Sequence, residues 1–445
     1  MRRTGVTLDG VTDDTDNFQK ALNACNGRLY IPKGTIKTTA QVDVPAGTEI
    51  VCDAGATISA GANYHALNCK GSVTITGLKM TRADAAQNSS WKAINVDNAV
   101  QALPANSRVI VRDCVITGFD IGVYVDGGAA PNVDFFELSS SRIVINNLGT
   151  GGGASVRPTV AGNNCAQVVI RDNRLDASAT GAVNNIYAIG SSKVDVIQNW
   201  IRRGHAVKVL SNAAHPVEQL RVIGNQMPDV NIAVICQADA TPIRLVEIHD
   251  NLVDTPTTAV SDVGCVYLGI LNAVAGAKAY EVVMASGNVF KNVPYSVWYP
   301  VMTVGNAFGT LVLGGNYYFD TSTADVGNYS IVNHGSLGTY DRLITANEAI
   351  VGNAHTRSYL QDRGGFTTFD IGPNIRERHR LEPRHSRDST HAAGRAVRRY
   401  EVQGESKNDR TSDRAAVGVE TLAPAQREKR SRPGLFFSER QANAR

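Results

Sequence analysis

Asp195, Arg221 and Glu247 are charged residues that recur 26 positions apart along the chain. Each stands four residues before an asparagine in a repeated strand-like unit, and His249 follows Glu247 by two residues. If the units stack about 4.8 Å apart, the two carboxylates lie roughly 10 Å apart at the backbone. Such a carboxylate pair suits a glycoside hydrolase, with Glu247 as acid and Asp195 as base, while Arg221 binds an acidic sugar. The alternative is a surface ion-pair ladder worth about 0–1 kcal/mol per pair.

A second candidate group combines a tyrosine with a lysine. Alternation in the segment 205–209 places Val207 and Val209 inside and Lys208 outside, and Tyr187 occupies the equivalent stretch of another repeat. An aromatic ring beside a cation can hold a sugar ring or a uronate. We therefore predict that Tyr187 and Lys208 bind substrate, although tyrosine is also common on strand surfaces for structural reasons.

A third candidate group lies around a strand in which the apolar residues of 121–125 point inward. Asp120, Tyr124 and Asp126 are then expected to cluster at one outward edge, and Asp134 and Glu137 follow shortly after. We predict substrate binding by Asp120, Tyr124, Asp126 and Glu137, with solvated surface carboxylates as the alternative.

The elements that must position these residues are defined by a sequence repeat. An apolar residue, a spacer, a second apolar residue and a turn containing asparagine recur at 168–173, 194–199, 220–225 and 246–251. A 26-residue period with alternation inside each unit is typical of one turn of a β-solenoid. A leucine-rich repeat would need several leucines and a helix per unit, and a propeller repeat would be longer. The repeat predicts an all-β chain, a right-handed parallel β-helix of about ten coils.

One helix is predicted before the repeats. The segment 12–15 offers N-cap residues, and Phe18, Ala21, Leu22 and Cys25 follow with helical spacing. We expect this helix to close one open end of the solenoid.

Three N-terminal segments resemble the opening of the pectate-lyase superfamily of β-helix proteins: 5–15 (GVTLDGVTDDT), 29–35 (LYIPKGT) and 55–58 (GATI). This superfamily includes bacteriophage tailspikes, polysaccharide depolymerases and polygalacturonase-like hydrolases. The resemblance covers about residues 4 to 370 and implies a β-helix, a polysaccharide substrate and a homotrimer. The polygalacturonase motifs are absent, since only Gly204 and His205 remain of Gly-His-Gly, which argues against pectin hydrolysis.

The resemblance and the candidate residues together predict a tailspike-like protein that binds and cleaves a cell-surface or extracellular glycan. Cleavage would proceed by hydrolysis, or by β-elimination as in a polysaccharide lyase, with Lys208 or His249 as base and Arg221 neutralising a uronate. A non-catalytic glycan-binding or structural virion protein is the alternative from another class, and an exopolysaccharide epimerase is a third. The predicted location is the virion tail or the outside of the cell after release from the host.

Charge divides the chain at its C-terminal end. Residues 374–445 contain 17 Lys and Arg against 10 Asp and Glu, a balance of +7, whereas the whole chain carries +3, so residues 1–373 carry −4. We predict three regions: 1–60 with the capping helix and first coils, 61–373 as the β-helix body, and 374–445 as an Arg-rich disordered tail. The alternatives for the tail are nucleic-acid contact, unlikely for the rest of the chain, and unrelated sequence joined to a finished domain.

Other classes of site receive no support from the sequence. The seven cysteines are scattered without a C-x-x-C motif, which predicts free thiols in the core rather than disulfides or zinc. No metal site and no cofactor are predicted. The N-terminus lacks the apolar stretch of a signal peptide, and no segment is apolar over the roughly 18 residues that a membrane helix needs.

Overall fold

The computed structural model describes residues 4–61, 64–82, 91–130, 132–145, 158–177, 184–254, 265–272, 278–292, 296–300, 307–319, 330–332, 339–346, 349–351, 357–362 and 365–370. The chain divides into two units, Met1–Arg380 and Leu381–Arg445, and every described residue belongs to the first. The tail predicted at 374–445 lies outside the described residues.

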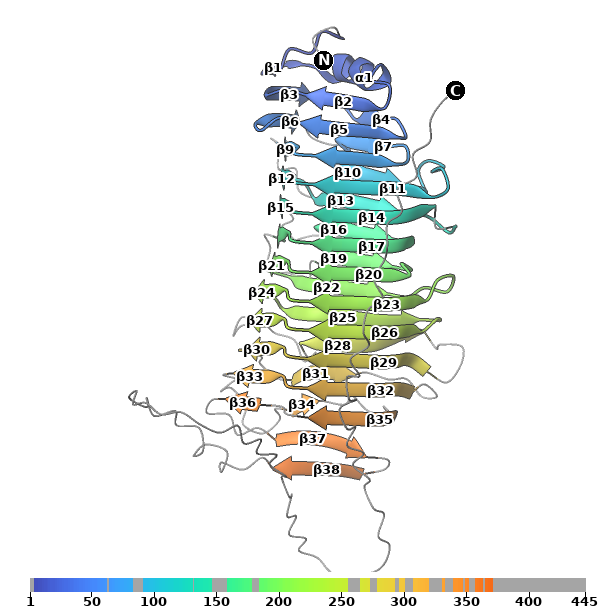
Figure 1. Cartoon of the computed structure of the whole chain (residues 1–445), viewed down its shortest axis with the longest axis vertical. Helices are drawn as coiled ribbons and strands as arrows, with labels where there is room; N and C mark the ends of the chain where they lie inside the picture. Colours follow the sequence, from blue (N-terminus) through green and yellow to red (C-terminus); the bar gives the residue numbers. More distant parts are fainter. Residues whose placement is uncertain are drawn as a thin grey trace, which may run out of the picture. The chain divides into compact units, whose positions relative to one another are not determined.

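Nearly all described residues belong to strands that stack in three parallel sheets (Figure 1). We call these sheets A, B and C. Each coil of the chain contributes one strand to each of them, in the order B, A, C.

Sheet A contains the shortest strands. It consists of β1 (Asp9–Asp13), β3 (Gly34–Thr38), β6 (Ala56–Ala60), β9 (Lys79–Arg82), β12 (Val115–Thr117), β15 (Arg142–Val144), β18 (Arg174–Asp176), β21 (Trp200–Arg202), β24 (Gln226–Pro228), β27 (Leu252–Asp254), β30 (Val289–Lys291), β33 (Tyr317–Phe319) and β36 (Ala349–Val351).

Sheet B consists of β2 (Arg28–Ile31), β5 (Thr48–Cys52), β8 (Val73–Thr76), β11 (Ser107–Arg112), β14 (Val133–Ser139), β17 (Cys165–Arg171), β20 (Lys193–Ile197), β23 (Val217–Ile223), β26 (Ile243–His249), β29 (Lys278–Ser286), β32 (Ala307–Gly314) and β35 (Thr339–Ala346).

Sheet C consists of β4 (Val42–Val44), β7 (Leu67–Cys69), β10 (Lys92–Asp97), β13 (Ile121–Asp126), β16 (Val160–Asn163), β19 (Asn184–Ile189), β22 (His205–Leu210), β25 (Ile232–Asp239), β28 (Val266–Asn272), β31 (Ser296–Pro300) and β34 (Ser330–Val332).

This architecture is the predicted parallel β-helix. Among the described residues, the three sheets have 13, 12 and 11 strands, which corresponds to slightly more coils than the ten or so expected. The strands after the last coil differ from the prediction, because β37 (Arg357–Asp362) and β38 (Gly365–Asp370) form an antiparallel hairpin.

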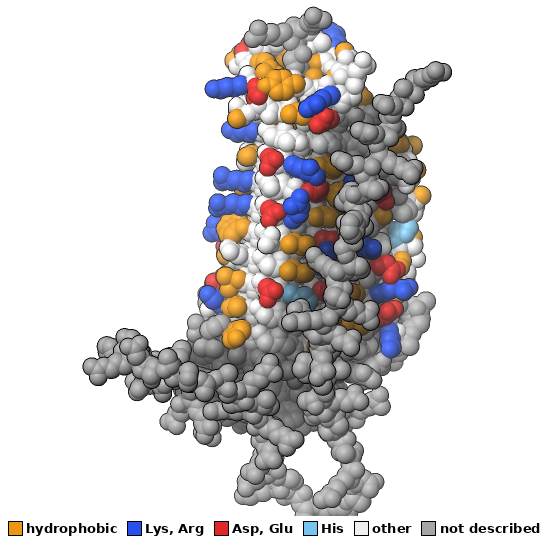
Figure 2. Space-filling model, in the orientation of Figure 1, with side chains coloured by type: hydrophobic (Ala, Val, Ile, Leu, Met, Phe, Trp, Pro, Cys, Tyr) orange, Lys and Arg blue, Asp and Glu red, His pale blue; other side chains and the backbone are white. Residues whose placement is uncertain are grey.

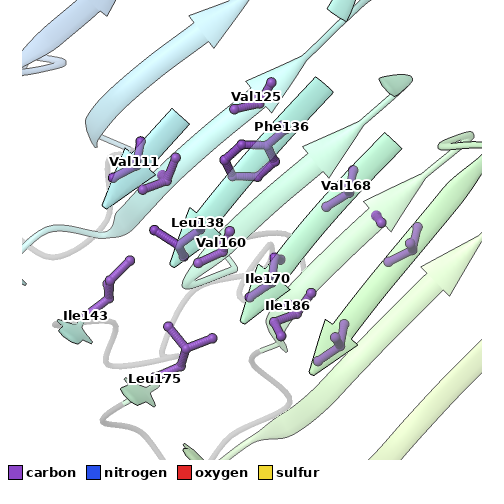
Figure 3. Packing of buried hydrophobic residues seen from close by; sticks show 14 of the residues in the cluster. Val111, Val125, Phe136, Leu138, Ile143, Val160, Val168, Ile170, Leu175 and Ile186 are labelled. Carbon is purple, nitrogen blue, oxygen red and sulfur yellow. The ribbon is translucent and has the colours of Figure 1, made fainter. Parts of the chain in front are cut away.

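The core follows from alternation within each strand. In β17, Val168 and Ile170 are fully buried while Val169 between them is partly exposed. Valine, isoleucine and leucine from all three sheets meet inside the solenoid (Figure 3). One continuous apolar column therefore fixes which residues point outward.

The bends between sheets B and A carry the asparagine ladder. The left-handed backbone of the bend lies at the residue before the asparagine and not at the asparagine itself: φ is 56° at Gln198, before Asn199. The asparagine is buried, and its side chain bonds the preceding coil. Asn199 Oδ1 accepts from the backbone N–H of Asn173 at 3.0 Å, and its amide donates to the carbonyl of Ile170 at 2.8 Å.

Helix α1 (Thr15–Asn23) lies at the N-terminal end of the stack, as predicted, with Phe18, Ala21 and Leu22 buried (Figure 1). Asp14 occupies the N-cap position without capping the helix through its side chain. Its carboxylate instead accepts hydrogen bonds from Thr7, so it closes the loop before the first coil.

All seven cysteines are free thiols, and five of them are buried in the core, as predicted, whereas Cys25 and Cys52 are only partly buried. Burial raises the pKa of Cys69 and Cys265 to about 12. In the part of the chain that the structure describes, no helix is long and apolar enough to cross a membrane.

Candidate active site

The predicted column of charges exists on the outer face of sheet B. Asp195 pairs in register with Arg221, and Arg221 with Glu247, on β20, β23 and β26. Arg221 Nε lies 2.6 Å from Asp195 Oδ1, and this hydrogen bond raises the pKa of the guanidinium. Glu247 accepts instead from the side-chain amide of Gln219 at 2.9 Å. Arg221 therefore binds Asp195, whereas Glu247 is hydrogen-bonded to a neutral amide.

His249 lies on the same strand as Glu247, as expected, but its ring is turned toward the next coil. Its Nδ1 lies 2.8 Å from the hydroxyl of Ser286. The four predicted catalytic residues thus share one face, with Arg221 between the two carboxylates.

Glu137 belongs to this same column rather than to the third group. It lies on β14 of sheet B, in register with Val169, which is in turn in register with Asp195. Its carboxylate contacts Arg112 at 2.8 Å and Arg171 at 3.0 Å. The chain leaves sheet C after Asp126 and re-enters on sheet B, so nearby residues in the sequence point out of different faces.

Asp120 is also separate from its predicted neighbours. It precedes β13, whereas Asp126 ends that strand. Asp120 forms a buried ion pair with Arg82 at 3.4 Å and accepts from the backbone N–H of Trp91 at 3.1 Å. These contacts make Asp120 a partner of β9 and not part of an exposed carboxylate cluster.

Tyr124 and Asp126 do come together, on the outer face of sheet C. The Tyr124 hydroxyl donates to Asp126 Oδ2 at 3.2 Å. Lys92 Nζ lies 3.5 Å from the centroid of the Tyr124 ring and 3.3 Å from Asp97 Oδ2. Asp97 and Asp126 pair in register on the adjacent strands β10 and β13. We call Lys92, Asp97, Tyr124 and Asp126 the sheet C cluster.

The surroundings of the cluster perturb its titrating groups. Burial lowers the pKa of Lys92, against the opposing charge of Asp97. Burial also raises the pKa of Tyr124. Asn95, in register with Tyr124, is fully buried, and no described residue donates a hydrogen bond to its Oδ1. Desolvated titrating groups beside an unsatisfied polar atom are typical of functional sites.

One oxygen of each carboxylate in the cluster is held by a turn. Asp97 Oδ1 accepts from the backbone N–H of Ala99 at 2.9 Å. Asp126 Oδ1 accepts from the backbone N–H of Gly128 and the amide of Asn164, both at 2.9 Å. Each Oδ2 therefore faces Lys92 or Tyr124 with its orientation already fixed.

Sequence reasoning missed Lys92 and Asp97, although a signal was present. The segments 94–97 (INVD) and 123–126 (VYVD) share a pattern that ends in aspartate, 29 residues apart. This spacing departs from the 26-residue period, so the two segments do not align with the later repeats.

Tyr187 and Lys208 lie in register on β19 and β22 of the same face, as predicted. Lys208 Nζ is 5.7 Å from the Tyr187 ring centroid, and no described carboxylate contacts it. Burial lowers the pKa of Lys208. Tyr267 follows in the same ladder beyond Ile235. Burial, with the charge of Lys208, also lowers the pKa of His205 to about 4, so its imidazole is neutral at pH 7.

The described residues include no group of three or more His, Cys, Asp or Glu side chains that could hold a metal ion.

The chain is similar to known proteins in structure and not in sequence. No family model matches the sequence, and no curated protein matches it. The catalytic domain of Agl-KA resembles the chain with a TM-score of 0.54 at 13% identity, over 80% of this chain and 67% of that one. A GH87 α-1,3-glucanase catalytic unit from Streptomyces thermodiastaticus gives 0.47 at 13% identity, over 78% and 68%. Bacteriophage phi29 gene product 12 gives 0.47 at 13% identity, over 83% and 58%.

The sheet topology and the likeness to Agl-KA define the class of the protein. The chain is a right-handed parallel β-helix protein, which is the architecture that its repeats and N-terminal motifs indicated.

Proposed function

We propose that the chain binds an extended cell-surface or extracellular glycan along the outer face of sheet C and cleaves it as a glycoside hydrolase. The observation that carries this proposal is the sheet C cluster, in which two carboxylates on adjacent coils contact a buried lysine and a tyrosine hydroxyl.

Two-carboxylate hydrolysis requires one carboxyl group to protonate the leaving oxygen and another to attack the sugar or activate water. Adjacent coils hold the backbones of Asp97 and Asp126 about 4.8 Å apart. This spacing is near the roughly 5–5.5 Å between the carboxyl groups of retaining glycosidases. The turn hydrogen bonds orient both groups before substrate arrives, which is the preorganisation that such catalysis uses.

The rest of the face suits a sugar chain. Tyr124, Tyr187 and Lys208 belong to one ladder that runs along the stack from the sheet C cluster. Tyrosine rings offer apolar area with a polar tip, and the lysine has no described carboxylate to neutralise it. A polysaccharide lying along the stack would contact these residues in succession.

Two other functions each have one observation in their favour. Glycan binding without cleavage is favoured because Asp97 Oδ1 and Asp126 Oδ1 accept hydrogen bonds from turn backbone N–H groups. This structural role alone can account for a carboxylate at each position. Cleavage by β-elimination is favoured by Lys208, because burial lowers its pKa and so shifts the amine toward the neutral form that abstracts a proton.

The test is an assay of the full chain on a panel of capsular and O-antigen polysaccharides. Hydrolysis releases new reducing ends without a new double bond, whereas elimination also leaves an unsaturated product that absorbs ultraviolet light. On a substrate that the parent cleaves, Asp97→Asn and Asp126→Asn should each reduce turnover by about 10²-fold or more. Asp134→Asn, an exposed carboxylate on β14, is the matched control and should retain full turnover. Binding without any release would establish the non-catalytic function instead.

The column on sheet B remains the rival site for the same reaction. If Glu247→Gln and Asp195→Asn abolish cleavage while Asp126→Asn leaves it intact, catalysis belongs to sheet B. In that case Glu247 acts as the acid, because Arg221 already binds Asp195.

The proposal extends to the setting of the protein. We place it on a virion tail or outside the cell, as a homotrimer that meets its polysaccharide at a surface. This setting follows from the tailspike resemblance of the N-terminal motifs.

A further inference from the structure

A groove runs along the bends between sheets B and A, away from the sheet C cluster. It has a volume of about 620 Å³ and is lined by residues of five successive coils. Its lining combines the bend residues Asp113, Asp172 and Gln198 with Arg142, Arg174, Trp200 and Gln226, which begin their sheet A strands. Volumes of roughly 300–1,000 Å³ are typical of ligand sites.

Arg142 and Arg174 are adjacent in register and have no carboxylate partner among the described residues. Several other arginines of the solenoid differ in this respect: Arg112 and Arg171 bind Glu137, and Arg221 binds Asp195. Like charges directly opposite each other in a sheet are destabilising. Two arginines at adjacent register positions, neither paired with a described carboxylate, therefore leave an anion position open.

Trp200 fixes the position of one of these guanidinium groups. It follows Arg174 in the ladder, and the Arg174 Cζ lies 4.4 Å from the centroid of its ring. Stacking on an indole orients a guanidinium without neutralising its charge. Its N–H groups stay available for a bidentate bond to a carboxylate.

The rest of the lining suits a sugar better than a bare ion. Asp113 and the two glutamine side chains can exchange hydrogen bonds with hydroxyl groups. The carboxylate of Asp172 also forms an ion pair with Arg171, whose Nη1 lies 3.4 Å from Asp172 Oδ2. Figure 2 shows lysine and arginine side chains along the left edge of the solenoid, over the upper sheet A strands. Lys79 lies in the same ladder two coils before Arg142, with Val115 between them.

We propose that this groove is a second glycan site, distinct from the cleavage site, and that it binds acidic sugar units through a carboxylate on Arg142 and Arg174. The inference goes beyond the proposed function, since it concerns a separate face and the charge of the ligand. A glycan anchored there would keep the protein on an acidic polysaccharide while sheet C acts on the chain.

The test is calorimetric binding of short uronate oligosaccharides to the full chain carrying Asp126→Asn and Glu247→Gln, which disables both candidate cleavage sites and so keeps the probe intact. The probes are tetragalacturonate and a hyaluronan hexasaccharide, each compared with its methyl-esterified form. At low salt at least one acidic probe should bind about tenfold or more tightly than its ester, as expected for charge-assisted bonds. Arg142→Gln and Arg174→Gln should each remove most of this preference, and Trp200→Leu should weaken it.

Arg108→Gln is the matched control, because Arg108 also stacks on an aromatic ring, Phe135 at 4.9 Å, but lies outside the groove. It should keep the preference unchanged. Equal affinity for acid and ester with both probes overturns the proposal, and so does inorganic sulfate binding as tightly as the oligosaccharides. Because this experiment measures binding, its result is independent of the cleavage assay. Loss of turnover in Asp97→Asn with no acid preference would support the first proposal and refute this one.

Discussion

Glu137 shows how a single outward residue on this solenoid depends on its neighbours in the stack. Burial raises the pKa of Glu137, but hydrogen bonds from Arg112, Ser139 and Arg171 outweigh it and hold the pKa below its ordinary value of 4.5. A carboxylate with a lowered folded-state pKa adds stability above its unfolded pKa. That stability is lost as the pH falls through the folded value.

We therefore expect Glu137→Gln to lower the melting temperature by a few degrees at pH 7, because two guanidinium groups lose their shared counter-ion. The difference from the parent should shrink as the pH falls below about 4.5 toward pH 3, where the parent carboxylate takes up a proton. Thermal melts across this range measure both effects. Glu49→Gln breaks the exposed pair with Arg28 at 3.2 Å and should change the melting temperature by little. A constant difference at all pH values would contradict the assigned interaction.

At the scale of the element, the strand register could be predicted from the sequence for some coils and not for others. From Asn173 to Asn251 every coil has 26 residues, so the strands, the bends and the column from Asp195 to Glu247 could be aligned by counting. Earlier coils vary in length, since 29 residues separate Asp97 from Asp126 in register.

Variable loops explain why the earlier site was only partly predicted. Loops between strands lie at the surface and tolerate insertions, so they hide the register from the sequence while the stacked strands preserve it. Tyr124 and Asp126 were therefore found, because alternation within one strand sufficed. Lys92 and Asp97 were missed, and Glu137 was assigned to the wrong face, because those assignments needed the register between coils.

The asparagine ladder is the element that ties the regular coils together, and its loss should be costly. Asn225 Oδ1 accepts from the backbone N–H and the side-chain amide of Asn199, at 2.9 and 3.0 Å, and its own amide donates to Val196. Asn225→Ala leaves buried donors without acceptors, so we expect a loss of about 2–4 kcal/mol. The neighbouring exposed Gln226→Ala should cost much less. Equal melting temperatures for the two variants would contradict a stabilising role of the ladder.

At the scale of the whole molecule, the basic segment 374–445 is predicted to be dispensable for folding. It combines a charge of +7 with no apolar periodicity, whereas residues 1–373 carry −4 and contain the repeats. Truncation after Pro373 should leave the melting temperature of the solenoid nearly unchanged. A drop of more than a few degrees, or insoluble protein, would mean that the segment packs on the β-helix or covers its end.

The outer face of sheet A also indicates how copies of the chain associate. The ladder that carries Arg142 and Arg174 on sheet A becomes apolar further along the stack, at Leu252, Val289 and Tyr317. Figure 2 shows hydrophobic side chains replacing the basic ones along this edge. Leu252 is 38% exposed and Tyr317 is 46% exposed, which is unusual for large apolar residues aligned on one strip.

We expect this strip to be covered in a homotrimer, because three copies around an axis would bury the same apolar ladder of each chain. Light scattering at micromolar concentration should then give about three times the 47.5 kDa mass of the chain. Leu252→Lys with Tyr317→Lys should shift the mass toward one chain while leaving the melting profile of the solenoid recognisable. Lys79→Gln, at the basic end of the same ladder, is the control and should leave the mass unchanged. A mass near 47.5 kDa for the parent chain would refute the trimer, and a trimer that survives both lysine substitutions would assign its interface to another face.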